Sequence, residues 1–191
     1  MVQAANPLAK PEALKLSHMG FYVRDLERMA RFYREVLGFT ETDRGSLGPV
    51  QLIFLSRDPT EHHQLVLASG RPQDSIYSVI NQLSFRVPDL PTLKYVYARA
   101  LAEPDVSDMQ PATHGNAISI YFRDPEGHRI EIFLDTPWYC EQPLREPADM
   151  SQSNEDILAH SERLARSRPK FRAQEVWQHE LSALMNRSRD A

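Results

Sequence analysis

Two segments of the chain share one plan, and this internal repeat constrains the fold more than any other feature of the sequence. The first segment reads LSHMGFYVRDLERMARFYREVLGF from residue 16, and the second reads INQLSFRVPDLPTLKYVYARALA from residue 80. A repeat of this kind indicates that one structural module occurs twice. Aligning the two segments places Phe85 on Phe21, Val87 on Val23, Asp89 on Asp25 and Gln82 on His18.

Each segment predicts a strand followed by a helix. A short, partly alternating apolar run comes first, which is typical of a strand. Asp25 and Asp89 then stand at N-cap positions, and apolar residues recur after them at helical spacing. Further strands are expected after each helix, and a turn at residues 124–127 joins the last pair. These strands are expected at residues 50–55 and 64–68 in the first half, and at 117–122 and 129–134 in the second.

Each half is therefore expected to be a βαββ or βαβββ module, which gives an α+β fold. Neither half can cover its own sheet face, so two paired modules are expected to form one curved sheet, a cup with helices outside. We assign residues 14–140 to this domain, residues 1–13 to a flexible N-terminus, and residues 141–191 to a linker and a tail of two amphipathic helices. The modules are expected at about 14–70 and 79–140.

Composition narrows the class of protein. The single cysteine, Cys140, excludes an internal disulfide and favours a reducing cytosol, so we expect a cytoplasmic protein. A net charge of −4 and a pI of about 6.0 do not suggest a nucleic-acid partner, which would favour a basic face. No apolar window approaches the roughly 20 residues that span a bilayer, and the first residues lack the apolar run of a secretory signal.

Two residues stand out as candidates for metal binding. His18 lies in the first expected strand, where a histidine is more often an ordinary core or surface residue than a ligand. Glu131 interrupts the apolar run 130–134, and a carboxylate is rarely buried unless it is paired or bound to a metal. The alternative for Glu131 is an edge strand that turns it to solvent.

The duplication brings further polar residues into consideration. Equivalent strands of the two halves approach each other across the sheet, which predicts ligands at His18, Gln82 and Glu131. His62 and His63 precede a strand, and neighbouring strand residues point to opposite faces, so one of them can reach a shared site. His114 and Tyr121 flank another strand, and they could equally be ordinary polar residues.

At this point the sequence resembles a known family. The repeat, then EHHQLVL, then HGNAISIYFRDPEGHRIEIFLDTPWY are similar to the vicinal-oxygen-chelate superfamily, which contains glyoxalases, bleomycin-resistance proteins and extradiol dioxygenases. The greatest likeness is to the catalytic half of type I extradiol catechol dioxygenases. It covers about residues 14–143 and implies two βαβββ modules that cup one metal.

The resemblance also implies roles for individual residues. His18 and Glu131 would be metal ligands, His63 an acid or base beside the metal, and Tyr121 a hydrogen-bond donor to substrate. His114 lies near the position of another dioxygenase histidine, although the spacing differs. The second metal histidine of the dioxygenases is replaced here by Gln82. A neutral amide oxygen favours Mg, Mn or Fe(II), and His63 as a fourth ligand stays open.

Three functions follow from this resemblance. The first is an extradiol-type dioxygenase that uses one divalent metal, Fe(II) before Mn, Zn, Ni or Co, to cleave a catechol-like aromatic with O2. The second is a glyoxalase-like isomerase, epimerase or lyase on a non-redox metal. The third is a non-catalytic module that binds an aromatic ligand or antibiotic. A homodimer or higher homo-oligomer is expected by analogy, and Tyr22, Phe85 and Trp138 are expected to line the cup.

Overall fold

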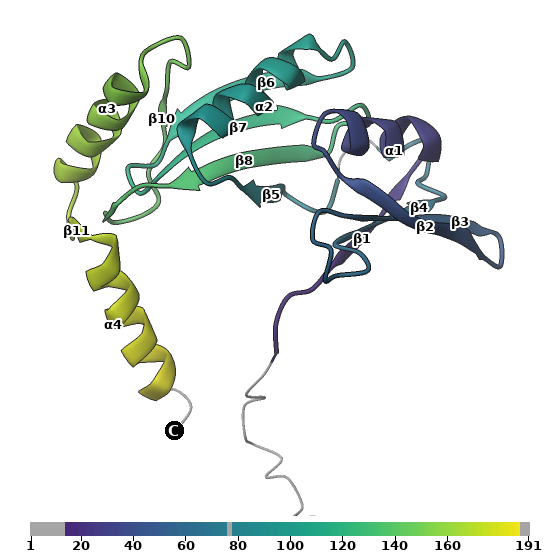
Figure 1. Cartoon of the computed structure of the whole chain (residues 1–191), viewed down its shortest axis with the longest axis horizontal. Coiled ribbons are helices and arrows are strands. Elements are labelled where there is room, and N and C mark those ends of the chain that lie inside the picture. Colours follow the sequence, from purple (N-terminus) through teal and green to yellow (C-terminus); the bar gives the residue numbers. More distant parts are fainter. Residues whose placement is uncertain (1–13, 76–77, 188–191) are drawn as a thin grey trace, which may run out of the picture.

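The computed structural model describes residues 14–75 and 78–187, and it confirms the two repeated modules (Figure 1). The flexible N-terminus expected at residues 1–13 lies outside the described residues. Each module has the order βαβββ. The first contains β1 (Met19–Val23), α1 (Leu26–Glu35), β2 (Thr40–Leu47), β3 (Val50–Ser56) and β4 (Leu65–Ser69). The second contains β5 (Leu83–Arg86), α2 (Leu90–Ala102), β6 (Ser107–Thr113), β7 (Ala117–Arg123) and β8 (Arg129–Asp135).

The two modules have the same strand order but separate sheets. The first sheet runs β1-β4-β3-β2, and the second runs β10-β6-β7-β8-β5, where β10 is Glu146–Pro147. In each module the first strand pairs in parallel with the last, β1 with β4 and β5 with β8. The single continuous sheet suggested by the repeat is therefore replaced by two curved sheets, because β1 and β5 each pair only within their own module.

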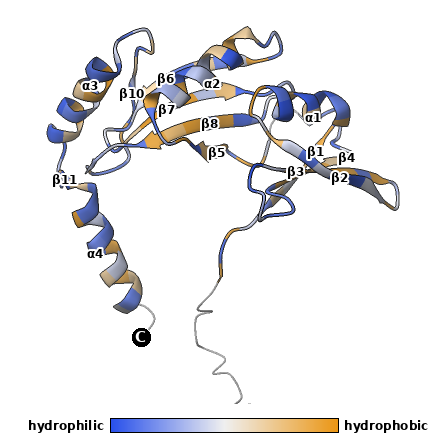
Figure 2. Cartoon of the chain, viewed as in Figure 1, coloured by the Kyte–Doolittle hydropathy of each residue, from blue (hydrophilic) through white to orange (hydrophobic). Residues whose placement is uncertain are grey.

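Strand alternation gives the second sheet one apolar and one polar face. The apolar face packs beneath α2, and β8 is largely apolar in Figure 2. Its side chains are at most 6% exposed: Ile118, Ile120, Phe122, Ile130, Ile132 and Leu134. The opposite face carries Ser119 and Tyr121 on β7 and Arg129 and Glu131 on β8. Because every second side chain of a strand points to the same face, these polar side chains lie together.

The modules meet through a buried polar network. Glu126, in the turn between β7 and β8, accepts hydrogen bonds from the backbone nitrogens of Arg24 and Asp25, both at 2.7 Å. Its carboxylate also lies 3.4 Å from the Arg71 guanidinium, and both side chains are less than 10% exposed. His128, which follows this turn, is also buried, and Arg71 donates to its Nε2 at 3.0 Å.

The same network predicts opposing pH effects on stability. Burial raises the pKa of Asp124 to about 7. The contribution of Asp124 to the free energy of unfolding is therefore complete below its ordinary pKa of 3.8 and is lost as the pH rises through 7. Burial, with Arg71 nearby, lowers the pKa of His128 to about 4. The contribution of His128 to the free energy of unfolding is therefore complete above pH 6.5 and is lost as the pH falls towards 4.

Asp124→Asn removes the pH-dependent contribution of Asp124 and leaves that of His128. We therefore expect the variant's free energy of unfolding to fall more steeply than that of the wild type as the pH is lowered from 6.5 to 4. Urea denaturation at several pH values measures this slope, with the exposed Asp74→Asn as a control. An unchanged slope in Asp124→Asn would contradict the assignment.

The C-terminal tail holds two helices, as expected, beyond a segment that is more ordered than a linker. Within that segment β10 pairs with β6. Ser161 of α3 (Asn154–Arg166) is buried and lies 2.7 Å from Thr113 of β6, so α3 packs on the second module. The two-residue strands β9 (Trp138–Tyr139) and β11 (Arg172–Ala173) pair with each other and lead to α4 (Gln174–Arg187), which projects from the body (Figure 1). Within residues 14–75 and 78–187, no helix is long and apolar enough to cross a bilayer.

Candidate functional site

Glu131 is the centre of a dense hydrogen-bond cluster on the polar face of the second sheet. Glu131 is only 8% exposed. One carboxylate oxygen accepts bonds from Ser84 Oγ at 2.6 Å and Gln82 Nε2 at 2.8 Å. The other accepts from Ser119 Oγ at 2.9 Å and Tyr121 OH at 2.5 Å. Four donors therefore fix the orientation of a carboxylate that strand alternation alone would leave as an unpaired buried acid.

Tyr121 links this carboxylate to His114. The tyrosine hydroxyl lies 2.8 Å from His114 Nε2, while His114 Nδ1 lies 2.6 Å from the carbonyl oxygen of Leu144. Burial, followed by the hydrogen bond to Glu131, raises the pKa of Tyr121 to about 12. The hydroxyl therefore stays protonated at neutral pH and can donate a hydrogen bond.

A second cluster contains the histidines of the first module. The rings of His18 and His63 are 4.3 Å apart between centroids, and His62 Nδ1 lies 2.9 Å from His63 Nδ1. His62 and His63 stand in the turn before β4, where both rings also contact Phe54 of β3. Burial, together with the neighbouring His18 and His62, lowers the pKa of His63. Three imidazoles thus gather at one end of the first sheet.

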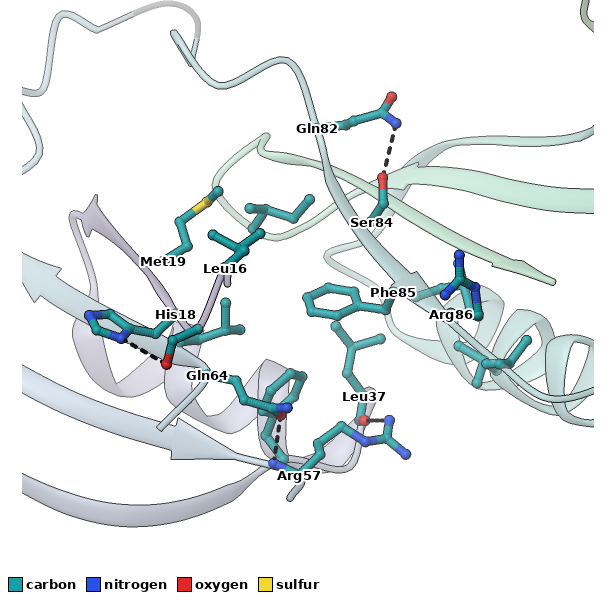
Figure 3. Close-up of a pocket in the computed structure, with 17 residues that line it drawn as sticks. Leu16, His18, Met19, Leu37, Arg57, Gln64, Gln82, Ser84, Phe85 and Arg86 are labelled. Carbon is teal, nitrogen blue, oxygen red and sulfur yellow. Dashed lines mark hydrogen bonds between the residues drawn. The ribbon is translucent and has the colours of Figure 1, made fainter. Parts of the chain in front are cut away.

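One chain does not bring His18 and Glu131 into the same pocket. A pocket of about 620 Å³ between the modules is lined by His18 and Gln82 but not by Glu131. Figure 3 shows the His18 ring and the Gln82 amide on different sides of this pocket, pointing away from each other. Within the part of the chain that the structure describes, no three His, Cys, Asp or Glu side chains are grouped so as to hold a metal.

The donor set itself suits a divalent cation. His18, Gln82 and Glu131 together offer an imidazole nitrogen, an amide oxygen and a carboxylate oxygen, which suit Fe(II), Mn(II) and similar ions. Gln82 presents its amide nitrogen to Glu131, so its amide must turn over to present the oxygen to a metal. These three ligand types therefore fit a divalent cation. In a single chain, however, His18 lies apart from the hydrogen-bonded pair of Gln82 and Glu131, and the metal assignments stay predictions.

The structure adds residues that sequence reasoning missed. Ser84 and Ser119 share the face of Glu131, and strand alternation could have found both. The same alternation puts Phe85 on the face away from the carboxylate, where it contacts Phe39 and lines the pocket between the modules. Arg145 lies 4.5 Å from the centre of the Tyr121 ring, and it comes from the segment interpreted as a linker.

Comparison with known proteins places this geometry in a family context. Biphenyl-2,3-diol 1,2-dioxygenase 3 from Rhodococcus globerulus is 28% identical over 126 residues, which is 63% of this chain and 63% of that enzyme. The match therefore spans less than two thirds of that enzyme's length. Fosfomycin resistance protein FosX from Mesorhizobium japonicum is 29% identical over 126 residues, 63% of this chain and 86% of FosX.

The fold comparison agrees with these matches. The crystal structure of a glyoxylase/bleomycin resistance protein/dioxygenase domain from Frankia sp. EAN1pec superposes with a TM-score of 0.56 at 23% identity, over 65% of this chain and 99% of that domain. This likeness concerns the fold alone. The family profile described as the Glyoxalase/Bleomycin resistance protein/Dioxygenase superfamily matches residues 15–132, more than half of the chain. The chain belongs to the Glyoxalase/Bleomycin resistance protein/Dioxygenase superfamily.

Proposed function

We propose that this protein is a metal-dependent enzyme that cleaves a catechol-like aromatic with O2, as extradiol dioxygenases do. The supporting observation is the cluster in which the Tyr121 hydroxyl contacts both the Glu131 carboxylate and the His114 ring. The 28% identity to a biphenyl-2,3-diol dioxygenase supports the same reaction class. The proposal thus rests on a buried carboxylate with a hydrogen-bond donor held beside it.

Each residue has a distinct part in this proposal. His18, Gln82 and Glu131 would hold the metal, which supplies open positions for the vicinal oxygens of the diol and for O2. Tyr121 would turn its single proton from Glu131 to a substrate oxygen, since its high pKa keeps the proton on the hydroxyl. His114 orients that hydroxyl through the 2.8 Å contact. His63, beside His18, takes the proton that the diol releases on binding.

Two copies of the chain would complete the site. In one chain the pocket between the modules is lined by His18, Gln82 and Ser84, but the Glu131 carboxylate does not line it. The open face of the first sheet also leaves Tyr22 57% exposed next to half-buried Phe54 and Val66. A homodimer that sets this face against the polar face of the second copy's second sheet would form two equal sites by symmetry. Each site would take its histidines from one copy and its carboxylate from the other.

Turnover of a catechol is the direct test of the dioxygenase proposal. The purified protein is reconstituted with Fe(II) without air and then given O2 with catechol, 3-methylcatechol and 2,3-dihydroxybiphenyl. We expect O2 uptake together with the yellow ring-cleavage product. Metal analysis is done on the same sample. Bound metal without turnover of any of these diols would refute the reaction and leave the metal site standing.

Removal of one hydroxyl tests the role of Tyr121. We expect Tyr121→Phe to keep its metal but to lower kcat/KM by roughly tenfold to a hundredfold, because a hydrogen bond to a charged group contributes about 1.5–3 kcal/mol. The exposed Tyr95→Phe on α2 is the matched control and should retain full activity. Equal kcat/KM values in the two variants would show that the hydroxyl has no part in the reaction.

A second candidate keeps the metal and changes the reaction. The glutamine at position 82 favours a hard, non-redox metal, and the FosX relative is matched over 86% of its length. The corresponding activity would be an isomerase, epimerase or lyase in which His63 or Glu131 moves a proton. Turnover without O2 and with Mn, Co, Ni or Zn in place of Fe(II) would separate this candidate from the first.

A further inference from the structure

Two arginines flank the tyrosine of the candidate site. The Arg145 guanidinium lies 4.5 Å from the centre of the Tyr121 ring, and the Arg129 guanidinium lies 4.9 Å from it. Arg129 is half-buried on the polar face of β8, two residues before Glu131, and Arg145 is exposed. Two positive groups thus stand beside the ring of the tyrosine whose hydroxyl serves the proposed reaction.

Among the described residues, these two arginines differ from their neighbours in having no acidic partner. On the same sheet face, Arg86 pairs with Asp135 at 2.9 Å and Arg123 pairs with Asp108 at 3.3 Å. Arg145 donates instead to a neutral acceptor, Gln110 Oε1, at 2.7 Å. Among the residues that the structure describes, neither Arg145 nor Arg129 forms an ion pair within 4 Å of a carboxylate. Their positive charge is available to a bound molecule.

The Glu131 carboxylate forms no ion pair with either arginine. Glu131 already accepts four hydrogen bonds from neutral donors, none of them an arginine. In the proposed function its carboxylate is a metal ligand, so a cation and two guanidinium groups would surround the tyrosine. A substrate that brings a negative group in addition to the ionised diol would balance this field more fully than a catechol without one.

The position of Arg145 is fixed by the tail. The next residues, Glu146 and Pro147, pair with Thr113 and Ala112 of β6, and the carbonyl of Leu144 lies 2.6 Å from His114 Nδ1. Arg145 also lies outside residues 15–132, the part that matches the superfamily. A segment added to the family domain therefore holds a guanidinium at the site.

We propose that Arg145 and Arg129 bind an anionic substituent, such as a carboxylate, on the substrate whose reacting end lies at Tyr121 and Glu131. The substrate class is then a catechol-like acid, an inference that rests on the proposed function. Arginine suits this role because its planar guanidinium donates two parallel hydrogen bonds to a carboxylate. Arg145 and Arg129 are specificity residues in this proposal.

The experiment compares acids with their neutral amides. The Fe(II)-loaded protein is assayed with 2,3- and 3,4-dihydroxybenzoate and with the corresponding dihydroxybenzamides. In parallel, calorimetry without O2 on the Zn(II)-loaded protein measures binding of the same four compounds. We expect one acid isomer to be favoured over its amide by about three- to tenfold in kcat/KM and in Kd, with a smaller preference at high salt, since an exposed ion pair is screened.

Substitution of the arginines assigns the preference. Arg145→Met and Arg129→Met keep an apolar stem against Tyr121 and should each bring the acid-to-amide ratio close to one. Arg99→Met is the matched control, because Arg99 lies 5.7 Å from the centre of the Tyr95 ring on α2, away from the site. Equal use of acid and amide by the wild type, or an unchanged ratio in both site variants, would overturn the proposal.

Turnover and calorimetric binding together distinguish the anion site from the proposed dioxygenase activity. An acid preference in calorimetry that disappears in Arg145→Met, without turnover of any diol, would keep the anion site and refute the dioxygenase. Turnover of diols with no preference for the acid would keep the dioxygenase and refute the anion site.

Discussion

Subunits carrying His18→Ala, mixed with subunits carrying Glu131→Ala, should regain activity that neither variant has alone. If each site takes its histidines from one copy and its carboxylate from the other, a mixed dimer holds one site with both ligands intact and one with neither. Random pairing of equal amounts gives half mixed dimers, so about a quarter of the wild-type sites should return. Co-expression with two different affinity tags, followed by metal analysis and an activity assay, measures this.

The matched control mixes two variants from the same cluster. Gln82 and Glu131 are hydrogen-bonded to each other in one chain, so Gln82→Ala and Glu131→Ala subunits can never combine into an intact site. Activity that returns in both mixtures would mean that mixing alone restores activity, without a site shared between two copies. Activity that returns in neither would place all the ligands within one chain.

The folds of the two modules could be predicted from local patterns. Asp25 and Asp89 cap helices α1 and α2 through their side chains, as the repeat indicated, and this follows from residues only three positions apart. The shared face of Tyr121 and Glu131 follows in the same way from the period of two along strands β7 and β8. Strand β2 was harder to predict, since its sequence TETDRGSL is almost wholly exposed and lacks apolar alternation.

The assembly of the site could not be predicted in this way. A repeat shows that two modules exist, but it does not decide whether the halves that complete a site belong to one chain or to two. That choice depends on contacts between distant residues, such as Glu126 with the backbone of Arg24. The burial of His128 by Arg71 is nonlocal in the same sense. Arg145 precedes a strand of only two residues, which leaves no periodic signal.

Loss of the Glu126 carboxylate should destabilise the protein more than any surface substitution. The side chains of Glu126 and Arg71 are 4% and 7% exposed. Glu126→Ala leaves Arg71 charged and without its acid partner in a buried place, and it removes the acceptor for the backbone nitrogens of Arg24 and Asp25. Breaking a buried pair from one side typically costs about 3–5 kcal/mol. Urea denaturation at neutral pH should show a loss of this size.

A matched control and a double variant separate the causes of this loss. Glu162→Ala removes an exposed pair with Arg166 on α3 and should change the free energy of unfolding by less than about 1 kcal/mol. Adding Arg71→Met to Glu126→Ala removes the buried charge, so part of the stability should return. The recovery stays incomplete because two backbone donors still lack an acceptor. Equal losses in Glu126→Ala and Glu162→Ala would mean that water reaches the network, and the modules would then be held together by apolar contacts such as that between Phe39 and Phe85.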